Sequence, residues 1–238
     1  MKDISFSAQN RRLVRSLSFH FEEGKTTALI GPSGSGKSTV LKLAAGLVTP
    51  NEGEVLFRGR NIARMGRQEN LMFRREAAVV FQDSALWENQ NLFQTLELPL
   101  RVHFPAMSKA ERERRIESVV TEVGYKKDLG IRPALLSMGE QKLLAFARAM
   151  MCRPQLLYLD EWTESLDQGA AQRLVNMVKN LKNRGASVIF VSHDIQIIRD
   201  LADIVVMILE GQIFLRLTKE QIDGDDDLGR YIEKGMAT

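Results

Sequence analysis

The sequence has little cysteine, little histidine and no long apolar run. Its single Cys152 cannot form an internal disulfide, which excludes a disulfide-stabilised secreted scaffold. Three scattered histidines and one cysteine make a zinc site untenable. The longest apolar runs, such as Ile204 to Leu209, stop at six residues, far short of the roughly 18 to 20 that cross a bilayer. No secretory signal is evident at the N-terminus, so we expect a cytoplasmic chain without a membrane span.

The sequence also has little excess charge. Its 33 basic and 30 acidic residues give a formal net charge of +3, which is too small to indicate a nucleic-acid partner. Clusters of like charge are interpreted as solvated faces, with contact to anionic lipid headgroups as the alternative. These clusters are Arg58, Arg60, Arg64 and Arg67; Arg112, Arg114 and Arg115; and Asp223 with Asp225, Asp226 and Asp227. With 238 residues, 44% of them hydrophobic, the chain can bury a core of its own.

Short runs rich in Val, Ile and Phe alternate with helical patterns along the chain. Such runs are typical of buried strands, and their alternation with helices predicts an α/β fold with a mostly parallel sheet covered on both faces. Alternating residues at 4–6 and 17–21 add an antiparallel strand or two. Residues 84–150 show no strand pattern and predict a helical insertion. The expected strands are 26–30, 54–57, 77–81, 156–160, 187–192 and 204–209, and the expected helices are 37–46, 108–123, 137–151, 168–184 and 194–201.

A glycine-rich segment directly after the strand 26–30 carries the strongest chemical signal. It satisfies the pattern G-x-x-x-x-G-K-[ST], in which backbone N–H groups surround a polyphosphate and a following helix directs its positive end at the charge. Lys37 is expected to bridge the β- and γ-phosphates, and the Ser38 hydroxyl to ligate Mg²⁺. The segment consists of Gly31, Pro32, Ser33, Gly34, Ser35, Gly36, Lys37, Ser38 and Thr39.

A second signal is the apolar strand 156–160, which ends in two carboxylates. Parallel strands deliver ligands to a bound nucleotide at their carboxyl ends. Asp160 is therefore expected to support Mg²⁺, and Glu161 to polarise the attacking water. Alone this pattern is common, and the phosphate loop upstream gives it weight.

Further segments stand in a characteristic order around these two. One of them is Leu136-Ser137-Met138-Gly139-Glu140-Gln141. The expected helix around Ala145 to Ala149 follows this segment, and both precede the strand 156–160. In order and spacing the chain resembles the ABC-transporter ATPase family over nearly its whole length. Val79 to Asp83 is similar to the family's Q-loop, 46–53 to the turn after its phosphate-loop helix, 164–167 to its D-loop, and 191–194 to the segment with its switch histidine.

The resemblance implies one ABC ATPase domain over residues 1–238 that binds ATP and Mg²⁺. Residues 1–83 and 151–238 would form the RecA-like core with its β-subdomain, and residues 84–150 the helical subdomain. Two copies would sandwich ATP between the phosphate loop of one and the Ser137 to Gly139 segment of the other. Ser137 would supply a hydroxyl and Gly139 a backbone N–H, while His193 would contact the γ-phosphate and hold Glu161. Gln82 would link Mg²⁺ and water to the helical subdomain, which would touch a transmembrane permease at the inner face of the cell membrane.

The sequence departs from the family pattern at several positions. Ala8 stands where the family stacks adenine on an aromatic side chain, which predicts weaker nucleotide binding unless another side chain substitutes. Met138 replaces a signature glycine, Glu140 also departs from the signature, and Trp162 follows Glu161 where proline is usual. These changes favour a slow or specialised ATPase. The rival interpretation is a catalytically dead regulatory module, although such a module would be expected to have lost Glu161 or His193, and both are present. A third interpretation, a soluble ABC protein of DNA repair or translation, is disfavoured because 238 residues hold one cassette.

The segment after Gln82 bears on the cargo. Residues 83–100 are similar to the corresponding part of Mla-type, Mce-associated phospholipid transporter ATPases. Trp87 and Phe93 are then expected to line a groove for a permease helix, or else simply to pack between helices. An Mce-domain lipid-binding protein would be a further partner. Lipoprotein, peptide and small-solute systems remain alternatives. A short helix at 228–234, after the acidic segment, is expected to dock on the neighbouring copy.

Overall fold

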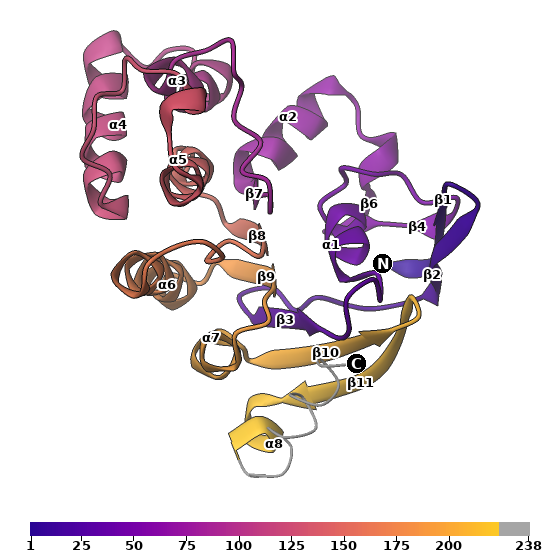
Figure 1. Cartoon of the computed structure of the whole chain (residues 1–238). Coiled ribbons are helices and arrows are strands. Elements are labelled where there is room, and N and C mark those ends of the chain that lie inside the picture. Colours follow the sequence, from indigo (N-terminus) through magenta and orange to yellow (C-terminus); the bar gives the residue numbers. More distant parts are fainter. Residues whose placement is uncertain (224–238) are drawn as a thin grey trace.

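Six strands form the central sheet of the structure, a computed structural model that describes residues 1–223 (Figure 1). In spatial order they are β11 (Gln212–Thr218), β10 (Ile204–Leu209), β3 (Thr26–Ile30), β9 (Ser187–Val191), β8 (Leu156–Asp160) and β7 (Ala77–Val80). From β10 to β7 all neighbours are parallel, and β11 is antiparallel to β10. The mostly parallel α/β sheet that the sequence predicts is confirmed. The phosphate loop and His193 follow two of its parallel strands, and Asp160 is the last residue of a third.

Successive residues of the inner strands pack into two cores on opposite faces of the sheet. On β3, Ala28 and Ile30 belong to one core and Leu29 to the other. On β8, Leu157 joins the first core and Tyr158 the second, and all five side chains are almost fully buried. Because both faces are covered, these strands are continuous apolar runs, and this is why the sequence reveals them.

Helices cover both faces of this sheet. Helix α1 (Lys37–Ala44) lies on one face, and α6 (Gln168–Asn183) and α7 (Ile195–Leu201) lie on the other (Figure 1). All three expected helices are confirmed, each within two residues at its ends. The Tyr158 hydroxyl donates to the Ala44 carbonyl at 2.9 Å and so ties the end of α1 to β8. The phosphate loop is thereby held between a buried strand and a tethered helix.

The N-terminal strands form a second, antiparallel sheet. Its order is β2 (Arg11–Leu17), β1 (Lys2–Ala8) and β4 (Glu52–Glu54). Antiparallel strands near the N-terminus are thus confirmed, but the expected strand at 17–21 is wrong because β2 ends at Leu17. Beyond it, Phe19 exchanges two backbone hydrogen bonds with Met1, and its ring packs edge to face on Phe21 with ring centroids 4.8 Å apart, but residues 18–22 do not continue the strand.

The expected strand at 54–57 is also wrong as a single element. β4 ends at Glu54, and β5 (Leu56–Phe57) pairs instead with β6 (Arg60–Asn61) in a separate hairpin. Between them Val55 is buried in the core, and its carbonyl accepts a hydrogen bond from the Ile62 N–H at 2.9 Å. The backbone changes partner at Val55, so one apolar run serves two sheets.

Residues 84–150 are helical and hold no strand. They contain α3 (Leu92–His103), α4 (Lys109–Val123) and α5 (Met138–Met150), with a 3₁₀ turn at Pro133–Leu135. The expected helices at 108–123 and 137–151 are confirmed. The division of the chain at residues 84 and 150 into separate subdomains stays a prediction.

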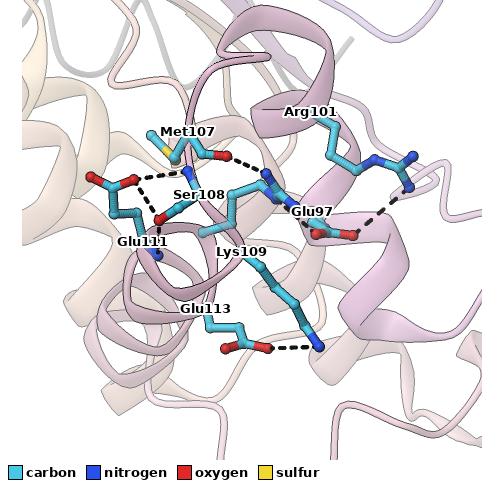
Figure 2. A network of polar contacts seen from close by, with 8 residues as sticks. Glu97, Arg101, Met107, Ser108, Lys109, Glu111 and Glu113 are labelled. Carbon is cyan, nitrogen blue, oxygen red and sulfur yellow. Dashed lines mark hydrogen bonds and ion pairs between the residues drawn. The ribbon is translucent and has the colours of Figure 1, made fainter.

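The junction of α3 and α4 is fixed by a polar network (Figure 2). Ser108 caps α4: its hydroxyl accepts from the Glu111 N–H at 3.3 Å, and the Glu111 carboxylate accepts from the Ser108 N–H at 2.8 Å. Glu97 on α3 accepts from Arg112 Nε at 2.8 Å and lies 4.0 Å from the Arg101 guanidinium. These bonds pair charges and helix-end N–H groups at the outer part of the insertion.

Several elements of the described chain have no counterpart among the expected strands and helices, including α2 (Arg67–Glu76), α3, β6, β11 and α8 (Lys219–Asp223). The expected helix at 228–234 and most of the acidic segment lie outside the described residues. Within residues 1–223, no helix is both long and apolar enough to cross a membrane.

Candidate active site

The phosphate loop has a backbone that only glycine accommodates at two positions. Gly31 has φ 140° and Gly36 has φ 103°, both in the region that side chains disfavour. A Cβ atom on Gly31 would lie 2.2 Å from the Ile208 carbonyl oxygen, and one on Gly36 2.7 Å from that of Leu13. The loop is therefore packed tightly against β10 and β2, and α1 begins immediately after it at Lys37.

Two side chains at the start of α1 reach back into the loop and across to β8. Lys37 Nζ donates to the carbonyls of Gly31 and Pro32 at 2.8 and 2.7 Å. Burial lowers the pKa of Lys37, opposed by the charges of Glu161 and Asp160. The Ser38 hydroxyl donates to Asp160 Oδ1 at 2.9 Å. The sequence therefore brings its predicted lysine, serine and aspartate to one place. Thr39 follows them in α1.

The two carboxylates at the end of β8 are largely removed from water. Asp160 is 2% exposed, and burial raises its pKa while the Ser38 hydrogen bond lowers it. Burial raises the pKa of Glu161 to about 7, with further contributions from the nearby charges of Asp160 and Glu164. Near neutral pH, Glu161 thus exchanges a proton readily, as a general base requires.

His193 and Gln82 approach Glu161 from neighbouring strands. His193 Nε2 lies 3.2 Å from Glu161 Oε1, and burial together with the charge of Lys37 lowers the pKa of the imidazole. Oε1 accepts no hydrogen bond from residues 1–223 and is itself shielded from solvent. The Gln82 amide donates to Glu164 Oε2 at 3.3 Å, a contact that the sequence did not suggest.

These residues line one open hollow of about 480 Å³ at the carboxyl edge of the sheet. A polar hollow of this kind, with a phosphate loop on one side and carboxylates on the other, suits a phosphorylated ligand. Its lining comprises Ser33, Gly34, Lys37, Ser38, Gln82, Glu161, Thr163, Glu164, Val191, Ser192, His193 and Asp194. Thr163, Ser192 and Asp194 were not predicted, although each adjoins a predicted residue.

The site also fits a magnesium ion. Mg²⁺ prefers oxygen ligands and commonly takes one or two from protein and the rest from water and phosphate. The adjacent oxygens of Ser38 and Asp160 match this preference. No cluster of three or more His, Cys, Asp or Glu side chains capable of holding a metal occurs in residues 1–223.

The predicted signature residues lie elsewhere. Ser137 caps α5, where its hydroxyl bonds to the Glu140 carboxylate at 3.0 Å, and Gly139 faces the D-loop, where an added Cβ would lie 3.0 Å from the Ser165 carbonyl. Neither Ser137 nor Gly139 lines the hollow. Met138, between them, is 68% exposed. The segment is therefore presented outward rather than toward the chain's own phosphate loop.

The other departures are equally visible. Ala8, at the end of β1, offers no ring for a base, and weaker nucleotide binding stays a prediction. The opposite flank of the phosphate loop is a second hollow of about 510 Å³, lined by Pro32 to Ser35 and by Phe214, which is 68% exposed.

Trp162 is fully buried and packs edge to face on Phe190, with ring centroids 5.3 Å apart. It thus replaces the usual proline as a core residue.

One residue at the site escaped the sequence analysis. Lys142 on α5 is 3% exposed, and its ammonium donates to the carbonyl oxygens of Gln82 and Glu161. The only available signal was a lysine on the otherwise apolar buried face of the expected helix 137–151.

A doubly covered, mostly parallel sheet with a phosphate loop and paired carboxylates at its carboxyl edge defines a P-loop nucleotide-binding protein. The model of the ABC transporter family matches residues 14–164, more than half of the chain. The chain belongs to the ABC transporter family of ATP-binding proteins, as the sequence resemblance implied.

Individual relatives agree with this assignment. The chain is 30% identical over 233 residues to the nickel import ATP-binding protein NikE of Shigella flexneri, covering 96% of this chain and 87% of NikE. It is 36% identical over 205 residues to the uncharacterized ABC transporter ATP-binding protein YejF of Escherichia coli, covering 84% of this chain but only 39% of YejF.

A solved structure is similar over nearly the whole length. The dimeric, post-hydrolysis state of the ATP-binding cassette MJ0796 bound to ADP and Pi has a TM-score of 0.85 and 26% identity, covering 92% of this chain and 97% of that one. The chain is an ABC ATPase, the ATP-binding motor subunit of a transporter. The resemblance to Mla-type phospholipid transporters is not reproduced among these relatives.

Proposed function

We propose that the hollow binds the γ-phosphate of ATP and that Glu161 activates the water that attacks it. The observation that carries this proposal is the convergence of Lys37, Glu161 and His193 on one polar hollow, where Glu161 Oε1 has no hydrogen-bond partner among residues 1–223. Glu161 takes the proton of the water as its O–P bond forms, and Lys37 compensates the charge on the phosphate oxygens. The bond from the γ-phosphorus to the bridging oxygen breaks, which yields ADP and inorganic phosphate.

His193 holds the γ-phosphate and the Glu161 carboxylate in register. Its lowered pKa keeps the imidazole neutral at pH 7, so one ring nitrogen donates while the other accepts. Ser38 and Asp160 would hold Mg²⁺, with Gln82 reaching it after leaving Glu164. When bound, the metal neutralises charge on the phosphate oxygens.

We infer that two copies close on two ATP molecules. Support comes from the outward presentation of Ser137 and Gly139, which lie outside the lining of the hollow in their own chain. A single phosphate loop leaves the hollow open to water, and donors from a second chain would complete it. The relative MJ0796 was solved as a dimer with ADP and Pi.

We also propose that the helices of residues 84–150 contact a transmembrane permease at the inner face of the cell membrane. Trp87 is 45% exposed beside α3, as a docking surface for a permease helix requires, and Phe93 packs partly against the core. The similarity of residues 83–100 to Mla-type ATPases supports a phospholipid cargo and an Mce-domain partner. The second candidate is a small-solute importer, favoured by the 30% identity to NikE, whose name states nickel import.

Affinity purification from native membranes tests these assignments. The Glu161→Gln chain, held with ATP and Mg²⁺, would be solubilised in mild detergent and its bound proteins and lipids identified by mass spectrometry. Recovery of a multi-span permease with an Mce-domain protein and phospholipid supports the lipid cargo. Recovery of a permease with a solute-binding protein favours the importer, and no permease would contradict both. Trp87→Glu is the matched variant: if it recovers the permease equally well, Trp87 is not part of the contact.

A further inference from the structure

Lys142 is a buried cation that does not line the hollow of the proposed active site. It is 3% exposed, although a lysine is rarely placed fully inside a protein without a specific partner. Its ammonium donates to the Glu161 carbonyl at 2.9 Å and to the Gln82 carbonyl. Burial lowers the pKa of Lys142, and the carboxylates of Glu164, Asp160, Glu161 and Asp83 oppose this effect. An apolar side chain of similar length would fill the same space without the cost of burying a charge.

The hydrogen bond from Lys142 is made to a residue, Glu161, whose backbone is strained. Glu161 has φ 44°, in the left-handed region that a residue with a long side chain seldom adopts. Such a conformation persists only where the surroundings fix it from several sides. Here the Glu161 N–H donates to the Val191 carbonyl at 3.2 Å and its own carbonyl accepts from Lys142. The residue is thus held on both sides, and its side chain is turned toward His193.

The same ammonium joins segments that are distant in sequence. Gln82 follows β7, Glu161 follows β8, and Lys142 lies on α5 little more than one turn after its N-cap Ser137. Gly139 on the same helix already touches the D-loop that continues from Glu161. Any displacement of α5 therefore moves the Lys142 ammonium relative to both carbonyls, because one side chain connects the helix to the two of them.

We propose that Lys142 is a positioning residue, which holds the backbone of Glu161 and Gln82 in place relative to the signature helix α5. This proposal rests on the catalytic role proposed for Glu161. Its consequence is specific: removing the two hydrogen bonds slows the hydrolytic step while leaving ATP binding at the phosphate loop nearly unchanged. Lys142 itself touches neither the phosphate nor the water.

The test compares Lys142→Met with Lys142→Arg and with the control Lys179→Met on α6, a partly exposed lysine whose ammonium pairs with Asp200 away from the site. Methionine keeps the length and volume of the side chain and removes the donors, whereas arginine keeps charge and donors. We expect kcat of Lys142→Met to fall about 10- to 100-fold, because small misplacements of catalytic groups cost this much. KM and the affinity for ATP should change less than about threefold, and Lys142→Arg should recover part of kcat. Thermal unfolding of each variant checks that it is folded, and Lys142→Gln replaces Lys142→Met if the latter is not.

Two outcomes would overturn the proposal. One is a kcat for Lys142→Met equal to that of Lys179→Met, and the other is a rise in KM at unchanged kcat. Glu161→Gln measured in parallel separates this failure from that of the underlying role. If Glu161→Gln hydrolyses ATP like the wild type, the assignment of Glu161 is wrong. If it is inactive while Lys142→Met is normal, only the positioning role fails. The double variant should be no slower than Glu161→Gln alone, because both changes act on the same step.

Discussion

At the scale of single residues, the fold removes the charged groups of the proposed site from water. Lys37, Asp160 and Glu161 are each perturbed chiefly by burial, and each is then compensated by a specific neighbour. The result is a carboxyl group, Glu161, whose pKa of about 7 lies near neutral pH and which has a neutral histidine and a lysine beside it. In the proposed function, a nucleotide entering this hollow would exchange water for preorganised donors, which is the main source of stabilisation in phosphoryl transfer.

The first prediction concerns the pH dependence of hydrolysis. Burial raises the pKa of Glu161 to about 7, and only the deprotonated carboxylate accepts a proton from water. We expect kcat to rise about tenfold per pH unit below pH 7 and to level off above it. Single-turnover hydrolysis measured from pH 5 to 9 tests this. A rate that is flat down to pH 5 would show that Glu161 titrates as an ordinary carboxyl group or is not the base.

The second prediction concerns Glu140 in the signature segment. Bonds from Lys127 and from the Ser137 backbone lower its pKa, so it is negatively charged at neutral pH. In the proposed dimer this charge would face the phosphates of the partner's ATP. Glu140→Gln should therefore tighten ATP-dependent dimerisation several-fold at low salt and less at 0.5 M salt, because the repulsion is screened. Sedimentation of both chains in a Glu161→Gln background measures it, with the exposed Glu113→Gln as the control. Equal tightening by both variants would mean that only net charge matters.

At the scale of elements, each helix of the insertion begins with a reciprocal cap. Asn91, Ser108 and Ser137 all accept from the N–H three residues on and receive a side chain in return. These caps fix where α3, α4 and α5 start, and the cap on α5 also occupies the hydroxyl that the proposed dimer requires. Ser137 must therefore exchange Glu140 for phosphate when the dimer closes.

The cap on α4 gives the third prediction, since it lies away from the nucleotide hollow (Figure 2). Ser108→Ala removes one cap and should lower the free energy of unfolding by about 0.5 to 2 kcal/mol with kcat unchanged. Denaturant unfolding measures this, and Ser118→Ala, on an exposed position within α4, is the matched control. That control should be neutral or slightly stabilising, because alanine favours helix interiors. Equal losses from the two variants would contradict the capping role.

The sequence predicts elements best where burial is two-sided or periodicity is long. Each apolar strand of the parallel sheet is visible for the first reason, and α4, α5 and α6 for the second. Helix α2 was missed because its ten residues are mostly polar or charged and bury only Phe73. β11 was missed because its exposed face carries the apolar Phe214 between Ile213 and Leu215, so the sequence does not alternate between apolar and polar residues although the burial does. The N-terminal breaks at Leu17 and Glu54 depend on tertiary partners that no local pattern records.

For the site, the sequence indicated the residues whose spacing itself reflects chemistry. The phosphate loop, Asp160, Glu161 and His193 each follow a strand, and parallel strands bring them to one edge. Lys142 could not be predicted, because its partners are two backbone carbonyls on other strands. The Gln82 to Glu164 bond is likewise a product of the fold. Roles that depend on contacts with a second chain stay predictions at this level.

At the scale of the whole molecule, one chain carries two incomplete half-sites. The hollow with Lys37 lacks the signature residues, and the segment with Ser137 lacks a phosphate loop. In the proposed dimer, two-fold symmetry would complete both at once, since each copy would give its loop to one site and its helix to the other. A chain defective in one half-site is then rescued by a chain defective in the other.

Mixing two inactive variants tests this arrangement. Lys37→Ala disables the loop and Ser137→Arg the signature, so each homodimer should be inactive. In a mixed dimer one site combines both defects and the other is intact. If half of the dimers are mixed, we expect about a quarter of the wild-type activity after dissociation and reassociation of the chains. Mixing Lys37→Ala with Glu161→Gln is the control, because both changes affect the same half-site and no intact site forms. Recovery in this control would show that Lys37 and Glu161 serve different half-sites, and no recovery in the test mixture would place Ser137 and Lys37 in a single-chain site.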